Sequence, residues 1–161
     1  MSLILMDNIL PNVDRYVDKI YQEEFYDFQD GDNTFRNIQI RPNTDLFCKF
    51  LSDLFPQFFV SLNIVRRSPY MQEEPNFVHT DEEMGDFTCI LYLNKNHPDD
   101  DGTTIYDDDG NPSMIVKSKY NRMFCFDSRL PHSRNLYENF GDGKDARLIQ
   151  VVFLNLDHEK L

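Results

Sequence analysis

The chain has 161 residues and a mass of 19.1 kDa, a size that suits one domain with a real hydrophobic core. Hydrophobic residues make up 40% of it, which excludes an intrinsically disordered chain. The formal net charge of −12 disfavours a nucleic-acid partner, because proteins bind a phosphate backbone through clustered Lys and Arg. We expect a single domain over residues 1–161.

Cysteine usage and the first residues bear on the compartment. Cys48, Cys89 and Cys125 lie far apart without a C-x-x-C pair, so neither a disulfide framework nor a thiolate zinc site is indicated. Residues 1–16 contain no positively charged leader and no apolar run near about 20 residues. We therefore expect a cytoplasmic protein with neither a signal peptide nor a membrane partner.

The first third of the chain shows two helical patterns. Asn12 is a candidate N-cap, and the apolar spacing after it predicts an amphipathic helix that ends near Asp27. Residues 29–33 have the composition of a turn. A second helix is predicted over residues 42–54, and Pro56 would end it. The apolar residues before the first helix are compatible with a strand.

After this region the pattern changes to short apolar or alternating runs separated by turn residues, which is typical of strands. The predicted strands are 58–67, 76–79, 87–93, 103–106, 114–116, 123–126 and 148–154. Helices followed by many strands predict a mainly β (α+β) fold, a cupin-like jelly roll or double-stranded β-helix. We expect residues 58–155 to form this core and residues 1–57 to give helical support on its outside.

Two acidic segments, residues 97–102 and 107–112, have the composition of exposed turns. The second resembles a calcium loop, because Asp107, Asp109 and Asn111 alternate as oxygen ligands do. Its glycine is misplaced for such a loop, however, and no bidentate Glu follows at the required distance. We interpret both segments as solvated turns.

His79 and Asp81 form the most informative pair in the sequence. Residues two apart on an extended strand point to the same side, so both side chains can bind one metal ion. With His132 they make two imidazoles and one carboxylate, the ligand set of non-haem Fe(II) oxygenases, whereas structural zinc sites favour thiolates. The alternative is a chance surface triplet and a turn histidine after Pro131.

Four segments carry a family resemblance. HTD at 79–81 is followed by FTCILYLNK at 87–95, MFCFDSRLPH at 123–132 and GKDARLIQVVF at 143–153. In this order they resemble the catalytic core of Fe(II)/2-oxoglutarate-dependent dioxygenases, most closely the prolyl 4-hydroxylase branch with the hypoxia-type enzymes. The likeness covers roughly half of the chain. It implies that the two histidines and the aspartate bind Fe(II), leaving positions for 2-oxoglutarate and O2.

Arg147, Tyr92 and Tyr70 are the candidate 2-oxoglutarate ligands. A buried carboxylate needs a partner that stays charged and donates two hydrogen bonds, as arginine does. Arg147 precedes an apolar strand; the alternative is a surface arginine paired with an acid, with Arg134 and Lys144 as substitute donors. The resemblance assigns Tyr92 to the cosubstrate, although a core tyrosine is equally compatible. Tyr70 lies near the family's Y-x-x-G segment, whose glycine this chain lacks.

Other residues have weaker functional interpretations. Val151 stands where hypoxia-type enzymes carry a threonine near the cosubstrate. Cys89 and Cys125 fall in predicted core strands and are expected to act as small hydrophobes. His97 and His158 are expected in solvent.

The resemblance implies an enzyme that decarboxylates 2-oxoglutarate to succinate and hydroxylates a C–H bond. The substrate would be a peptidyl side chain, with prolyl as the family-weighted choice, or a small molecule. Two alternatives remain: a non-catalytic metal-binding jelly roll that acts as a sensor or scaffold, and a cupin-type oxygenase without a 2-oxo acid. Arg147 and Tyr92 favour the dioxygenase, because a plain metal protein has no need of them.

Overall fold

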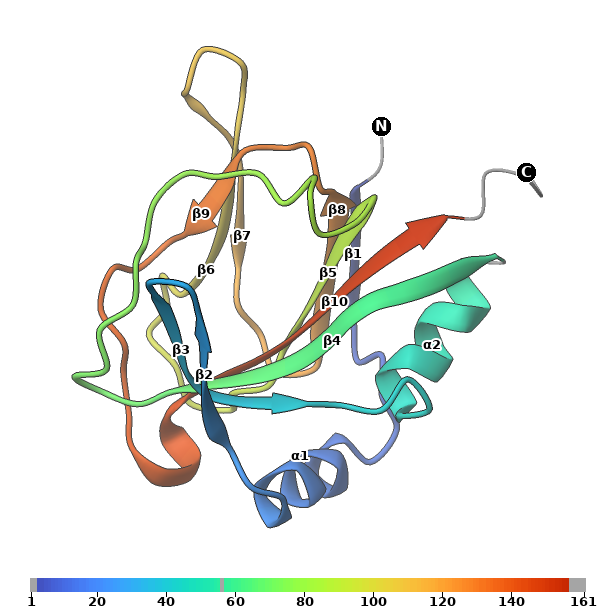
Figure 1. Ribbon diagram of the computed structural model, residues 1–161, viewed down its shortest axis with the longest axis vertical. Coiled ribbons are helices and arrows are strands. Elements are labelled where there is room, and N and C mark those ends of the chain that lie inside the picture. The colour runs from blue at the N-terminus through green and yellow to red at the C-terminus, as the bar shows by residue number, and fades with distance from the viewer. Residues whose placement is uncertain (1–2, 56, 157–161) are drawn as a thin grey trace.

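Two antiparallel sheets form the body of the molecule in the computed structural model, which describes residues 3–55 and 57–156 (Figure 1). In chain order the elements are β1 (Leu3–Asp7), α1 (Val13–Gln22), β2 (Tyr26–Asp30), β3 (Asn33–Ile40), α2 (Leu46–Leu54), β4 (Phe58–Ser68), β5 (Phe87–Tyr92), β6 (Gly102–Tyr106), β7 (Pro112–Lys117), β8 (Arg122–Asp127), β9 (His132–Arg134), the 3-10 helix η1 (Gly143–Asp145) and β10 (Arg147–Leu156). The large sheet has the order β1-β8-β5-β10-β4-β3-β2, and the small sheet has the order β7-β6-β9. The expected jelly roll with helices on its outside is confirmed.

The central strands of the large sheet are buried on both faces. Successive side chains of a strand point to opposite faces, so each strand contributes to two cores. In β5, Cys89 and Leu91 pack in an outer core with α1 and α2, whereas Ile90 and Tyr92 pack in an inner core. Figure 1 shows both helices on one side of this sheet and β6, β7 and β9 on the other. The inner core therefore lies between the two sheets.

A buried polar network fixes the helices to the large sheet. The Tyr16 hydroxyl of α1 lies 2.6 Å from Gln150 Oε1 of β10 and 3.0 Å from Asp45 Oδ2. Gln150 Nε2 donates to Asp45 Oδ2 at 2.9 Å and to Asn63 Oδ1 of β4 at 2.7 Å. Asp45 also caps α2 by accepting from Cys48 N at 2.9 Å. One carboxylate thus connects both helices to the two central strands.

Several element boundaries differ from the sequence predictions. The first helix ends at Gln22, not near Asp27, and residues 26–40 form the hairpin β2–β3 that was missed. All five residues of β2 are exposed, so its sequence carries no alternation of burial. Residues 1–57 consequently add three strands to the large sheet besides the two helices.

Two further expectations need correction, and two more concern residues that the structure does not describe. Asn12 precedes α1 as expected, but its φ of 51° is left-handed and its side chain caps nothing. The predicted strand 76–79 is reduced to one isolated bridge at His79. Pro56 and His158 lie outside the described residues. Among the helices that the structure describes, none is long and apolar enough to cross a membrane.

We predict that Asp45→Ala lowers the free energy of unfolding by about 2–4 kcal/mol, because it removes a helix cap and leaves buried donors unsatisfied. Asp53→Ala, at an exposed position of α2, is the matched control and should change the free energy of unfolding by less than about 0.5 kcal/mol. Urea unfolding followed by circular dichroism measures both. Equal effects of the two substitutions would contradict the anchoring role of Asp45.

Candidate metal and cosubstrate site

The main chain brings the three predicted metal ligands together at one end of the sandwich. His79 and His132 exchange two backbone hydrogen bonds, His79 N to His132 O at 3.0 Å and His132 N to His79 O at 2.9 Å. Asp81 N donates to Ser128 O at 2.8 Å, which fixes the third residue beside them. One candidate ligand atom from each of these three residues lies within 4.8 Å of the others. The structure therefore assembles the H-x-D pair and the distant histidine as the sequence predicted.

Backbone carbonyls orient both imidazole rings. His79 Nδ1 lies 2.9 Å from Phe77 O, and His132 Nδ1 lies 3.0 Å from Leu130 O. A proton on each Nδ1 satisfies these carbonyls and leaves each Nε2 as the ligand atom. His132 Nε2 is 3.0 Å from Asp81 Oδ2, and His79 Nε2 is 3.5 Å from Asp81 Oδ1. Both ring nitrogens and the carboxylate thus face a common point.

The site keeps its carboxylate ionised. Burial raises the pKa of Asp81, but hydrogen bonds from His132 and His79 outweigh it and hold the pKa well below its usual range. The hydrogen bond with Asp81 is the largest cause that raises the pKa of His79. An anionic oxygen beside two imidazoles suits a divalent cation, and such a cation competes with protons for the Nε2 atoms.

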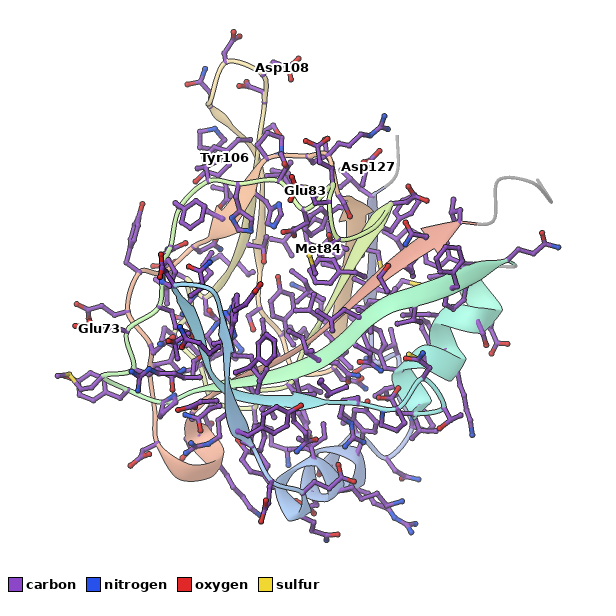
Figure 2. The ribbon with its side chains drawn as sticks, viewed as in Figure 1. Glu73, Glu83, Met84, Tyr106, Asp108 and Asp127 are labelled. Carbon is purple, nitrogen blue, oxygen red and sulfur yellow. The ribbon has the colours of Figure 1, made fainter. Side chains whose placement is uncertain are left out.

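The site is closed on its inner side and open at His79. The His132 side chain is 7% exposed and lies edge-on to Phe126, with ring centroids 4.7 Å apart. The His79 side chain is 39% exposed. Figure 2 shows Glu83 and Met84, which follow Asp81 in the chain, at the same end of the molecule as Tyr106 and Asp127. A ligand can therefore reach the three residues from the side of the exposed His79.

Arg147 lies on the inner face of β10, where the sequence analysis expected a carboxylate partner. It is 4% exposed, and its Nε finds no hydrogen-bond acceptor among the described residues. The nearest acid is Asp101, whose Oδ1 lies 3.6 Å from Arg147 Nε and also lacks a hydrogen bond. A buried guanidinium with an unsatisfied donor is costly unless a ligand completes it. The residues present thus fit a bound carboxylate.

Tyr92 belongs to the same inner face. It pairs with Ile149, two residues after Arg147, and its hydroxyl lies 2.6 Å from Thr103 Oγ1 of β6. Burial raises the pKa of the Tyr92 hydroxyl to about 12, so the group stays protonated and can donate. Tyr92 and Thr103 together place two hydroxyls between the sheets.

Tyr70 and Lys144 lie elsewhere. The Tyr70 side chain is 63% exposed, so the expectation that it contacts the cosubstrate has no support in the structure. Lys144 is on the surface, with Nζ 3.7 Å from Asp18 Oδ1. Arg134 does enter the interior and its Nε also lacks an acceptor among the described residues, but its Nη2 donates to Asn139 Oδ1 at 2.8 Å and its Nη1 lies 3.8 Å from Glu74 Oε2. Arg147 is therefore preferred over both substitute donors.

The first acidic turn was partly misinterpreted. Asp101 is 1% exposed and faces Arg147, although the sequence analysis placed it in solvent. The following Gly102 has a φ of 150°, and a Cβ there would overlap the carbonyl oxygen of Val116. The sequence could have indicated this burial, because the aspartate directly precedes a glycine that the backbone conformation requires, and an alternating strand follows. In the second turn, Asp107 Oδ1 accepts from Asp109 N and Asn111 N, as the turn interpretation expects.

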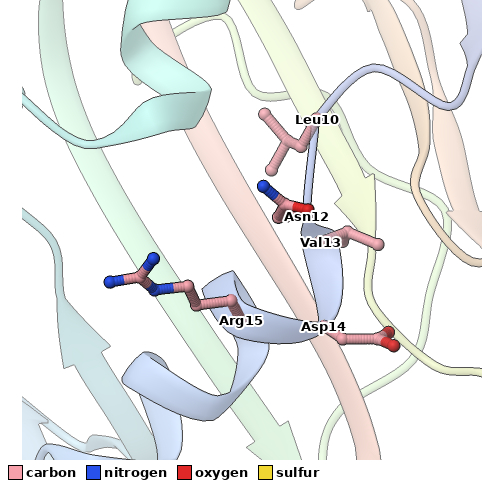
Figure 3. A pocket seen from close by; sticks show the side chains of 5 residues that line it. All are labelled: Leu10, Asn12, Val13, Asp14 and Arg15. Carbon is pink, nitrogen blue, oxygen red and sulfur yellow. The ribbon is translucent and has the colours of Figure 1, made fainter.

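A separate hollow lies at the start of α1 and is lined by Leu10, Asn12, Val13, Asp14 and Arg15 (Figure 3). Helix α1 packs on the outer core, whereas His132 and Arg147 belong to the space between the sheets. The hollow brings together one carboxylate and one guanidinium on a single helix and no cluster of metal ligands. It is not part of the candidate site.

No family model matches the sequence, and no curated protein matches it. The fold does have solved counterparts. An oxidoreductase of the 2OG-Fe(II) oxygenase family from Burkholderia pseudomallei superimposes with a TM-score of 0.64 at 12% identity, covering 94% of this chain and 84% of that one. A Trichoplax adhaerens prolyl hydroxylase, in complex with a peptide fragment of the hypoxia inducible factor oxygen degradation domain, gives 0.62 at 18% identity, covering 98% and 84%.

A third counterpart is HygX from Streptomyces hygroscopicus, whose structure holds nickel, 2-oxoglutarate and hygromycin B. It gives a TM-score of 0.55 at 10% identity and covers 97% of this chain and 83% of that one. At sequence identities of 10–18%, the structural similarity establishes the fold alone. The chain has the double-stranded β-helix fold that is found in 2OG-Fe(II) oxygenases.

Proposed function

We propose that this protein is an Fe(II)- and 2-oxoglutarate-dependent dioxygenase that hydroxylates a C–H bond of its substrate. The observation that carries the proposal is the convergence of His79, Asp81 and His132 at one end of an interior that also holds the unsatisfied Arg147. A metal ligand set alone suits a sensor as well as an enzyme. A buried guanidinium between the same sheets adds a reason to bind a 2-oxo dicarboxylic acid.

Each residue has a definite task in this proposal. Fe(II) and 2-oxoglutarate, when bound, would supply the oxidising chemistry, in which O2 is consumed and 2-oxoglutarate becomes succinate and carbon dioxide. The two Nε2 atoms and the Asp81 carboxylate would hold three metal positions and leave three for ligands. Arg147 would bind the distal carboxylate of 2-oxoglutarate, and the hydroxyl of Tyr92 would donate beside it. Phe126 would exclude water next to His132.

The open side of the site supports an organic substrate with apolar surface. Phe77 is 59% exposed, Val78 49% and Met84 38%, and all three are close in sequence to the metal ligands. The segment at 87–95 favours the prolyl 4-hydroxylase-like branch, and the fold counterparts include one with a peptide and one with a small molecule. We propose a peptidyl side chain, prolyl foremost, with a small molecule as the second class.

Removing a metal ligand should abolish turnover. We expect His79→Ala and Asp81→Ala to weaken Mn(II) binding at least about 100-fold, beyond the effect of losing a residue that only orients a ligand. Calorimetry measures the binding, and release of labelled carbon dioxide from 2-oxoglutarate with Fe(II) measures the activity. His97→Ala, outside the ligand set, is the control. Tight metal binding without any 2-oxoglutarate decarboxylation would instead identify a non-catalytic metal protein.

Replacing Arg147 tests the cosubstrate. Arg147→Gln should weaken binding of 2-oxoglutarate about 10- to 100-fold, the range for losing a charge-assisted hydrogen bond, and leave Mn(II) binding unchanged. Lys144→Gln, three residues earlier on the surface, should change neither. Thermal unfolding of both variants checks that Asp101 without its partner does not unfold the protein. Unchanged 2-oxoglutarate binding in a folded Arg147→Gln would favour an oxygenase that uses no 2-oxo acid.

A further inference from the structure

Three arginine side chains enter the space between the sheets. Arg147 is one; Arg66 of β4 pairs with the inner-face residue Ile149, and Arg134 of β9 pairs with Thr103. Two carboxylates are buried with them, because the side chains of Glu74 and Asp101 are only 9% and 2% exposed. In a chain whose net charge is −12, the part of the interior away from the metal ligands therefore holds three guanidinium groups and only two carboxylates.

Two of the three guanidinium groups lie within ion-pair distance of a buried acid. Arg134 donates to Asn139 at 2.8 Å and lies 3.8 Å from Glu74, which also accepts from Ser68 Oγ at 2.8 Å. This set ties the segments around Glu74 and Asn139 to β4 and is structural. Arg147 lies 3.6 Å from Asp101.

Arg66 is the unpaired member of the group. Among the described residues its side chain has neither a hydrogen bond nor an ion pair, and its guanidinium carbon lies 5.7 Å from the centroid of the Phe35 ring. Burial lowers the pKa of Arg66; Glu74 opposes this effect, and the nearby Arg147 adds to it. The guanidinium group in excess of the two carboxylates is thus one that Phe35, from the β2–β3 hairpin, partly covers.

Strand register places Arg66 beside the candidate cosubstrate residues. Tyr92, Ile149 and Arg66 lie in one row across β5, β10 and β4. Arg147 pairs with Ser68, two residues along β4 from Arg66, which makes the two arginines diagonal neighbours on the inner face. Side chains of this length can converge over Ile149, with Tyr92 on the opposite side.

Asp101 makes a second cation necessary. A carboxylate that approaches Arg147 also approaches the Asp101 oxygen 3.6 Å away, so the pair as a whole offers it no net charge. In a buried site that repulsion is only weakly screened. Arg66 supplies the missing positive charge, so that one incoming carboxylate faces two guanidinium groups and one buried carboxylate.

Resting on the proposed function, we propose that Arg66 acts with Arg147 as a second guanidinium for the distal carboxylate of 2-oxoglutarate. The pair would make the site selective for 2-oxo acids that carry a second carboxylate. In this role Arg66 binds the end of the cosubstrate that does not react, so its loss should act on cosubstrate binding.

The test compares two 2-oxo acids of equal chain length on the full chain loaded with Mn(II). Calorimetry measures the Kd of 2-oxoglutarate and of 2-oxopentanoate, which lacks the distal carboxylate. We expect Arg66→Gln to raise the Kd of 2-oxoglutarate about ten-fold or more and that of 2-oxopentanoate less than about two-fold. Arg66→Lys, which keeps the charge without the planar fork, should lie between Arg66→Gln and the native protein.

Arg67→Gln is the matched control. Arg67 is the next residue of β4, faces the opposite side and donates to Gly143 O at 3.2 Å, so its loss should leave both Kd values unchanged. The ratio of the two Kd values of the native protein is a second test, which does not depend on whether the variants fold. The native protein should bind 2-oxoglutarate at least about 100-fold more tightly than 2-oxopentanoate, as two charge-assisted contacts require.

Failure of this proposal is distinguishable from failure of the proposed function. If folded Arg66→Gln binds 2-oxoglutarate like the native protein while Arg147→Gln does not, Arg66 has no role and the dioxygenase proposal stands. Equal weakening of both 2-oxo acids, or no preference in the native protein, also overturns the role of Arg66. If the native protein with metal binds no 2-oxoglutarate at all, the proposed function itself fails.

Discussion

The reciprocal backbone hydrogen bonds between His79 and His132 are the constraint on which the candidate site depends. They attach the irregular segment that follows β4 to the short strand β9 and set the imidazole centroids 4.4 Å apart. Because main-chain carbonyls also orient both rings, the ligand geometry is determined by the backbone before any metal arrives. Such preorganisation lowers the cost of binding, since little side-chain freedom is lost. Asp81 completes the set through its own backbone bond to Ser128.

The two faces of the large sheet carry residues with different roles. On β10, Gln150 faces the outer core and joins Asp45 in the helix-anchoring network, whereas Arg147 and Ile149 face the inner space. Adjacent residues of one strand therefore serve different purposes. Substitutions on the outer face should act through folding, and those on the inner face through ligand binding.

Much of the fold and of the metal site could be predicted from the sequence. Strands such as β5 and β8 carry dense apolar runs because both of their faces are buried, and the H-x-D spacing brings both side chains to one site even though the expected strand is only a bridge at His79. The hairpin β2–β3 could not be predicted in this way, because the side chains of β2 are all exposed. Spacing likewise cannot tell which of the adjacent Arg66 and Arg67 faces inward; only the register with Ile149 decides this. Because the segment around Asp101 is rich in acidic residues, its sequence does not show that one of these carboxylates is buried.

The positions of the free thiols determine which side chains are exposed to oxidation at the site. Cys48, Cys89 and Cys125 all lie in the outer core, so the large sheet stands between their sulfur atoms and the site. Reactive oxygen released at a metal held by His79, Asp81 and His132 would first meet aromatic neighbours such as Phe77 and Phe126. The thiols are thus shielded from oxidation during turnover without substrate, whereas the thioether of Met84, exposed at the open side of the site, is not.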